Sequence, residues 1–188
     1  ATGFPCTIAC EVPMGEGISS GDGSFNPDDW VAHKDQKKID TFILFGIAAA
    51  EMAIKDSGWE PNSESDNFRA GVGVGSGIGG LASIEKTALL LKEKGPRRVS
   101  PFFIPGALIN LAAGQISIRN NLKGPNLAAV TACASGSHSI GEGAQMIKAN
   151  KADIMVVGGA EAAICPLGMA GFSASRALST NFNDSPEK

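Results

Sequence analysis

The sequence has few of the residues that bind metal ions or form disulfide bonds. Its 188 residues include two histidines and four cysteines: Cys6, Cys10, Cys133 and Cys165. No two cysteines have the CxxC spacing of a zinc site or a redox motif, and both histidines are far along the chain from Cys6 and Cys10. We therefore expect no structural zinc, no disulfide framework and a reducing compartment.

The sequence also lacks an excess of positive charge and a long apolar run. Sixteen Lys and Arg residues stand against 19 Asp and Glu, a net charge of -3, which argues against bulk nucleic-acid binding. No segment approaches the roughly 20 apolar residues that span a bilayer. The best candidate, residues 41–54, contains Glu51. The opening residues have no basic start and no long apolar core, so we expect no signal peptide there.

Apolar periodicity predicts helices that alternate with strands. Residues 1–38 are rich in glycine and proline and predict irregular structure with a short helical turn. Beyond them we predict a buried helix at 38–58 with Gly58 as its C-cap, a strand and turn at 68–77 and an amphipathic helix at 81–92. A charged turn at 92–98 follows, and then an extended piece and an apolar helix within 99–118. The last predicted elements are a strand at 126–132, a helix at 134–150 and a strand at 152–160. This order indicates an α/β fold with a parallel sheet.

Cys133 lies where the predicted strand ends and the next helix begins. The first-turn N–H groups and the dipole of a helix favour a thiolate, and a backbone N–H at such a turn can point at a developing oxyanion. The residues after Cys133, from Ala134 to Ser137, are small enough to admit a substrate. The position is that of a nucleophile elbow. A buried, unreactive cysteine is the alternative.

A nucleophilic cysteine usually needs a base or acid partner, and the sequence offers none. His138 is five positions from Cys133, which rotates its side chain by roughly 140° around a helix of 3.6 residues per turn. We therefore expect His138 to be a hydrogen-bonded core residue and His33, in a charged stretch, to be solvated. Either Cys133 is inert, or its partners lie outside these residues.

The run GSGIGG at residues 75–80 matches the dinucleotide-binding pattern and follows a predicted strand. A nucleotide site would need an acidic residue about 20 positions on, at the end of a following strand. Glu93 is near that distance but falls in the predicted charged turn, with no strand before it. Tight packing of a helix is the better interpretation of these glycines.

Several motifs together resemble the elongating β-ketoacyl-[acyl-carrier-protein] synthases of fatty acid synthesis. In the order of the family, and from about Ser24 onward, they are FNPDDWVAHKDQKKID, GSGIGGL, SPFFIP, TACASGSHSIG and GGAEAAICPLGMAGFSASRALS. The resemblance implies the thiolase fold, with two duplicated βαβαβαββ halves in five layers, and a homodimer. It implies a decarboxylative Claisen condensation that extends an acyl chain by two carbons, with acyl carrier protein as partner and no cofactor.

The resemblance also assigns roles to individual residues. Cys133 would carry the acyl chain as a thioester. Gly77, Ile78 and Phe172 would line the acyl pocket, and Phe103 would reach the pocket of the partner across the dimer interface. Without the resemblance, the two phenylalanines are ordinary core aromatics. Basic residues that could simply be solvated would bind the acidic carrier protein: Lys34, Lys37, Lys38, Arg97, Arg98 and Arg176.

The resemblance covers only the first half of the family's fold. In the family, two histidines, a lysine and the second oxyanion donor belong to the second half. We therefore expect residues 1–188 to be a single incomplete domain that carries the nucleophile, lacks the opening strand and the second half, and is inactive alone.

Other functions remain open at this point. A polyketide synthase ketosynthase or another cysteine acyltransferase of the thiolase fold has overlapping motifs. A cysteine hydrolase or a degradative thiolase-type enzyme would use the same thiol. A non-catalytic chain-length factor is disfavoured because those subunits lack the cysteine. Bacterial cytoplasm is the expected compartment, with mitochondrion or plastid as the alternative.

Overall fold

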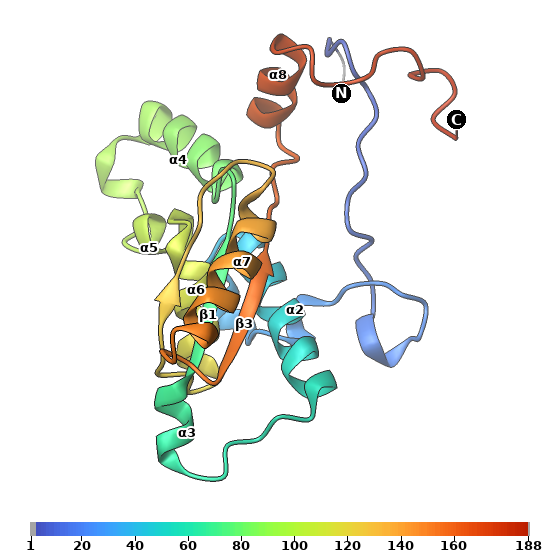
Figure 1. The fold of residues 1–188 in the computed structure, drawn as a ribbon. Helices are drawn as coiled ribbons and strands as arrows, with labels where there is room; N and C mark the ends of the chain where they lie inside the picture. The colour runs from blue at the N-terminus through green and yellow to red at the C-terminus, as the bar shows by residue number, and fades with distance from the viewer. Residues whose placement is uncertain (1–2, 188) are drawn as a thin grey trace.

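The computed structural model describes residues 3–187. Within this range, parallel strands form one sheet in the order β2–β1–β3, from β1 (Ala70–Gly75), β2 (Asn126–Leu127) and β3 (Ile154–Gly159) (Figure 1). Helix α7 (Ser135–Lys148) packs against β1 and β3 on one face, and α2 (Thr41–Ser57) and α6 (Asn110–Arg119) cover the other. The predicted α/β class with a parallel sheet is confirmed.

The other helical segments connect or flank this central unit. They are η1 (Gly17–Ser19), η2 (Pro27–Asp29), α1 (His33–Gln36), α3 (Glu64–Arg69), α4 (Leu81–Lys94), η3 (Pro96–Arg98), α5 (Phe103–Ala107) and α8 (Pro166–Ala174). Helices α4 and α8 follow β1 and β3, so both lie beyond the end of the sheet at which the strands finish (Figure 1).

Strand β1 is buried along its whole length and alternates glycine with valine. Side chains alternate between the faces of a strand, so the glycines share one face and the valines the other. A Cβ at Gly73 would lie 3.7 Å from the Ser139 carbonyl oxygen, and one at Gly75 would lie 3.1 Å from the Ser135 Cβ. The glycine face therefore lets α7 approach closely, which brings the start of α7 over the end of β1.

The apolar core lies on the valine face. Phe42, Ile43 and Ile47 of α2 are almost completely buried against Ile116 of α6 and Val72 of β1. Burial of one such side chain contributes about 1.5–3 kcal/mol to stability. The core therefore fixes α2 and α6 on the sheet and makes β1 the rigid centre of the chain.

Both ends of α2 have defined caps. The Asp40 Oδ1 accepts a hydrogen bond from the Phe42 N–H at 3.2 Å. Its Oδ2 accepts from the N–H of Ser83 at 3.1 Å and from the Ser83 hydroxyl at 2.6 Å, which joins α2 to α4. Gly58 follows the helix with a φ of 64°, a left-handed conformation that suits glycine. The predicted C-cap is confirmed.

Three local predictions are wrong in part. The proline-bounded piece before α6 is not simply extended, because residues 103–107 form α5. Pro105 is third in that helix, where a missing N–H leaves no hydrogen bond unmade. The predicted strand at 126–132 pairs only through Asn126 and Leu127, since the chain then leaves the ladder and passes over Gly75. Glu93 lies in the last turn of α4, not in a turn outside it.

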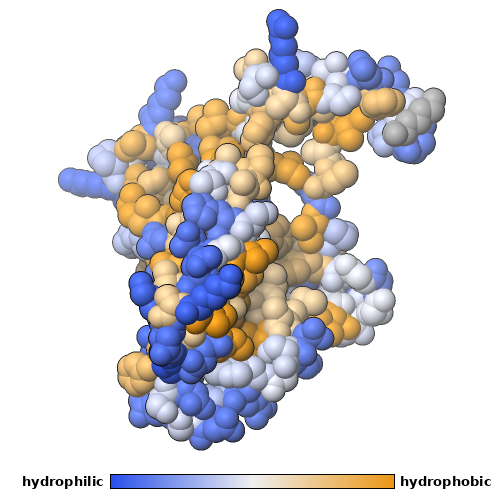
Figure 2. All heavy atoms as spheres, in the orientation of Figure 1, coloured by the Kyte–Doolittle hydropathy of each residue, from blue (hydrophilic) through white to orange (hydrophobic). Residues whose placement is uncertain are grey.

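Apolar side chains are exposed at several places on the described surface. They include Leu89 and Leu91 of α4, Ile104 of α5 and Leu167 of α8, in regions where Figure 2 shows apolar atoms at the surface. Exposed apolar side chains of this number favour association. None of the helices within residues 3–187 is long and apolar enough to cross a membrane.

Candidate active site around Cys133

Cys133 lies in a sharp turn between β2 and α7, and its side chain is exposed. The preceding residue, Ala132, has a φ of 50°, a left-handed conformation that is unusual for alanine. Ser135, which is almost completely buried, holds this turn. Its hydroxyl accepts a hydrogen bond from the Thr131 N–H at 3.0 Å and donates to the Ala132 carbonyl at 2.7 Å. The turn therefore presents the thiol at the start of α7.

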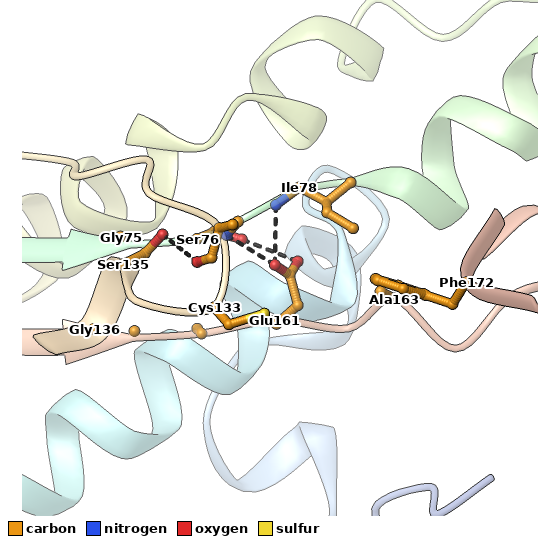
Figure 3. Close-up of a pocket in the computed structure, with 13 residues that line it drawn as sticks. Gly75, Ser76, Ile78, Cys133, Ser135, Gly136, Glu161, Ala163 and Phe172 are labelled. Carbon is orange, nitrogen blue, oxygen red and sulfur yellow. Dashed lines mark hydrogen bonds between the residues drawn. The ribbon is translucent and has the colours of Figure 1, made fainter. Parts of the chain in front are cut away.

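The thiol faces a mostly apolar cavity of about 630 Å³ (Figure 3). The carboxyl ends of parallel strands meet at one edge of a sheet, and ligands commonly bind there. Accordingly, the walls come from the segments that follow all three strands: residues 75–78 after β1, residues 132–136 around Cys133 and residues 159–163 after β3. Phe172 of α8 closes the cavity on another side.

Neither histidine lines this cavity in residues 3–187. His138 is not a core residue as predicted, because 44% of its side chain is exposed. It is hydrogen-bonded as predicted, with Nδ1 3.3 Å from the Thr131 Oγ1. The side chain of His33 is 77% exposed, which confirms that it is solvated. The described part of the chain thus supplies a thiol to the cavity but no histidine.

Glu161, which the sequence reasoning did not single out, binds the turn that follows β1. Its Oε2 accepts hydrogen bonds from the backbone N–H groups of Gly77 at 2.8 Å and Ile78 at 3.0 Å. Its Oε1 accepts from the Ser76 hydroxyl at 3.0 Å, and the Ser76 Oγ accepts in turn from the Gly79 N–H at 3.0 Å (Figure 3). This turn is the GSGIGG run.

The position of Glu161 gives a physical reason against dinucleotide binding. In a dinucleotide site, the backbone N–H groups of the glycine-rich turn bind pyrophosphate. Here an internal carboxylate already accepts from those of Gly77 and Ile78. A signal for Glu161 did exist in the sequence: it is the one charged residue in the apolar run from Ile154 to Ile164, directly after a predicted strand.

Cys165 contrasts with Cys133. It is buried at the start of α8, where its Sγ accepts a hydrogen bond from the Gly168 N–H at 3.4 Å. Burial raises the pKa of the Cys165 thiol, so its reactive thiolate is scarce at neutral pH. Cys165 therefore caps a helix. No cluster of three or more His, Cys, Asp or Glu side chains could hold a metal ion in the range that the structure describes.

A second, smaller cavity of about 210 Å³ gathers positive charge between α4, α5 and the segment before α2. Of the predicted carrier-binding residues it brings together Lys37, Lys38 and Arg98, and it adds Lys86 of α4. Phe103 also lines this cavity and does not line the Cys133 cavity. Lys34, Arg97 and Arg176 are exposed but do not line it.

Comparison with known proteins identifies the family. Residues 7–188 match the family described as "Beta-ketoacyl synthase, N-terminal domain". The chain belongs to this β-ketoacyl synthase family. It is 54% identical over 185 residues to the 3-oxoacyl-[acyl-carrier-protein] synthase 2 of Rhizobium meliloti, which covers 98% of the chain and 43% of that protein.

Other β-ketoacyl synthases are similar over the same part. The chain is 49% identical over 188 residues to 3-oxoacyl-[acyl-carrier-protein] synthase 2 of Coxiella burnetii, covering all of the chain and 42% of that relative. It is 46% identical over 181 residues to the mitochondrial 3-oxoacyl-[acyl-carrier-protein] synthase of Arabidopsis thaliana, covering 96% of the chain and 38% of that relative. The chain thus spans about two fifths of the length of these relatives.

Solved β-ketoacyl synthase structures share the fold. A β-ketoacyl synthase from Burkholderia phymatum superposes with a TM-score of 0.74 at 29% identity, over 88% of this chain and 40% of that one. A chain in the structure of a type II polyketide synthase acyl carrier protein in complex with its ketosynthase, bound to the hexaketide, superposes with a TM-score of 0.75 at 25% identity. The match covers 82% of this chain and 44% of that one. The chain has the thiolase-like fold of the amino-terminal half of these enzymes.

Proposed function

We propose that this β-ketoacyl synthase chain is the nucleophile-bearing part of a β-ketoacyl-[acyl-carrier-protein] synthase of fatty acid elongation. The observation that carries the proposal is the exposed Cys133 thiol at the mouth of an apolar cavity. A volume of about 630 Å³ falls in the range of about 300–1,000 Å³ that is usual for small-molecule sites. An apolar lining suits an acyl chain, since burial of each methylene contributes about 0.8 kcal/mol.

The first proposed step loads the acyl chain. The Cys133 thiolate attacks the carbonyl carbon of the acyl thioester on the carrier protein, and the carrier thiol leaves with a proton. A backbone N–H at the Cys133 turn, with a second donor from outside this chain, stabilises the negative oxygen that develops during the attack. The acyl chain then lies along Phe172, Gly77 and Ile78, all of which line the cavity.

The second proposed step makes the carbon–carbon bond. Malonyl carrier protein loses CO₂, and its carbanion attacks the acyl carbonyl on Cys133. The Cys133 thiolate leaves, and the product is a β-ketoacyl thioester two carbons longer. Neither histidine of this chain lines the cavity within the described residues. We therefore assign the groups that assist decarboxylation to the part of the full-length enzyme that corresponds to the remaining length of the relatives. The isolated 188-residue chain should therefore not condense.

The partners are also part of the proposal. We infer that acidic acyl carrier protein docks on the predicted basic residues, of which Lys37, Lys38 and Arg98 line one small cavity. A homodimer would place Phe103 in the pocket of the second subunit. We place the enzyme in bacterial cytoplasm, with an organelle as the alternative, because one relative is mitochondrial. Fatty acid elongation is favoured over polyketide synthesis because the relatives near 50% identity are 3-oxoacyl synthases.

Mass spectrometry of the full-length enzyme after incubation with acyl carrier substrate tests the proposal. We expect one acyl group, located on Cys133. Cys165 is the internal control, since it has the same chemistry but is buried with a raised pKa. Acylation of Cys165 or Cys6 instead of Cys133 would reject the assignment, and release of free acid without malonyl carrier protein would indicate a hydrolase.

A further inference from the structure

We propose that Glu161 is a positioning residue that sets the chain-length limit of the acyl pocket. It does so by fixing the turn that carries Ile78. This inference rests on the proposed function, because it assigns a role within the same acyl pocket. Glu161 would not touch the reacting atoms; it would act through the backbone of the turn.

The carboxylate of Glu161 organises nearly the whole turn. It accepts directly from the N–H groups of Gly77 and Ile78, and it holds the Ser76 hydroxyl, which accepts from the Gly79 N–H. Hydrogen bonds to a charged acceptor are stronger than those between neutral groups. Gly79 has a φ of 74°, which is a conformation that a regular strand or helix would not supply. The turn therefore depends on Glu161 for its shape.

The turn that Glu161 holds contributes Ser76, Gly77 and Ile78 to the wall of the cavity. The Ile78 side chain is 37% exposed and lines the cavity, so its position determines how far an acyl chain can extend. Since the Ile78 N–H is itself bonded to the carboxylate, loss of that bond frees the residue that forms the wall. No intermediate element is needed to transmit the effect.

The same turn also supports the loop that holds the nucleophile. A Cβ built on Gly77 would lie 3.1 Å from the carbonyl of Ala132 and 3.1 Å from the Glu161 Oε2. Gly77 is therefore packed between the residue before Cys133 and the carboxylate. The glycine at this position allows Glu161 to approach the turn from the β3 side without displacing the Cys133 loop.

The test compares three substitutions in the full-length enzyme. Glu161→Ala removes both acceptor oxygens. Glu161→Asp keeps the charge but shortens the side chain by one methylene, so it no longer reaches the turn. Glu161→Gln keeps the length of the side chain and removes the charge. Its amide oxygen can accept from both backbone N–H groups, and its NH₂ group can donate to the Ser76 Oγ, so the turn should keep its shape. Glu51→Ala is the matched control. It removes a carboxylate that forms an ion pair with Arg119 at 3.2 Å, and Glu51 does not line the Cys133 cavity.

Two readouts are measured, condensation with a series of acyl primers and hydrogen exchange of the peptide that contains residues 75–80. We expect the ratio of kcat/KM for long over short primers to rise about tenfold in the Ala and Asp variants, because one methylene in a pocket changes specificity by that order. Exchange at the turn should be faster in the same two variants. The Gln variant should restore the wild-type ratio, and the Glu51 control should not change it.

The possible outcomes separate the two proposals. A uniform fall in activity at all chain lengths, with an unchanged ratio in both the Ala and Asp variants, would overturn the role of Glu161. If Glu161→Ala does not fold, Glu161→Asp decides the question. A wild-type enzyme that condenses no primer would overturn the proposed function instead, and the exchange measurement would still show whether Glu161 holds the turn.

Discussion

Two turns at the same edge of the sheet are built from similar parts and do different things. Each connects a strand to a helix, β1 to α4 and β2 to α7, and each contains a buried serine that accepts a backbone hydrogen bond, Ser76 and Ser135. In the first turn, N–H groups bond to Glu161 of the same chain. In the second, the turn exposes Cys133 two residues before α7 begins.

We expect the first turn to shape the wall of the cavity and the second turn to present the Cys133 thiol to it. A turn whose donors bond to an internal carboxylate is rigid and closed to anions, so it can define the shape of a pocket. In the second turn the thiol of Cys133 lies two residues before α7, where the positive end of the helix dipole favours negative charge on sulfur or oxygen. Substitutions in each turn should therefore affect different steps, and the following predictions test that division.

The largest effect is expected for Cys133→Ala in the full-length enzyme. Condensation should fall below detection, because the covalent carrier of the acyl chain is lost, while the thermal melting temperature should change little, because the lost thiol is exposed. Cys165→Ala is the matched control and should keep condensation, with lower stability from the loss of a buried helix cap. Condensation that survives Cys133→Ala would show that the second turn does not carry the nucleophile.

A smaller loss is expected for Ser135→Ala. The change removes the hydrogen bonds that the Ser135 hydroxyl makes with the Thr131 N–H and the Ala132 carbonyl, each of which contributes about 0.5–1.5 kcal/mol. The Cys133 turn should loosen, so acyl transfer should slow about tenfold with little change in the primer series. Ser139→Ala, one turn later on α7, is the control; its hydroxyl donates to the Ser135 carbonyl at 2.9 Å within the helix. Equal losses in rate for the two variants would indicate general destabilisation of α7.

Sequence reasoning found the second of these turns more completely than the first. A lone cysteine between a strand and a helix, followed by small residues, indicates a candidate nucleophile, and the structure places this exposed thiol at the cavity. The partner of the first turn was missed because Glu161 is 84 residues from Gly77 along the chain. Only the pairing of β1 with β3 brings them together.

The same limit explains the other errors. The Gly58 cap depends on neighbouring residues alone and was predicted correctly. The helix before it also forms, but it is buried only between Phe42 and Ala50, and Met52 is exposed. The length of β2 depends on what lies across the sheet: the Ala129 carbonyl passes over Gly75, and no local pattern indicates this contact. Lys86 was missed because it joins the other basic residues only when α4 packs beside α5.

Ile78→Phe in the full-length enzyme tests the first turn as a wall. The added bulk should shorten the pocket, so long primers should lose kcat/KM while short primers are nearly unaffected. Each excluded methylene forfeits about 0.8 kcal/mol, or roughly a fourfold change. Ile78→Val removes one methylene and serves as the control for a change at the same site without added bulk. A uniform loss across the series, with a lower melting temperature, would make Ile78 an ordinary packing residue.

The smallest effect is expected for Lys86→Glu, outside both turns. Lys86 lines the small cavity together with Lys37, Lys38 and Arg98. Reversing the charge of its side chain should therefore weaken docking of an acidic carrier protein. Lys38 is a poorer test, because Asp35 already pairs with it at 2.7 Å. We expect the KM for carrier protein to rise by about threefold to tenfold at low salt, with kcat unchanged, since exposed charges act mainly on association.

The comparison variant for this experiment is Lys148→Glu. Lys148 has the same charge and is exposed, but it lies at the last turn of α7, at the opposite end of the helix from Cys133. The two variants have the same net charge, so a difference in KM between them reports position alone. The difference should shrink as salt rises above about 0.1 M, where screening acts within about 10 Å. Equal KM values for Lys86→Glu and Lys148→Glu would remove Lys86 and its cavity from the carrier-binding surface.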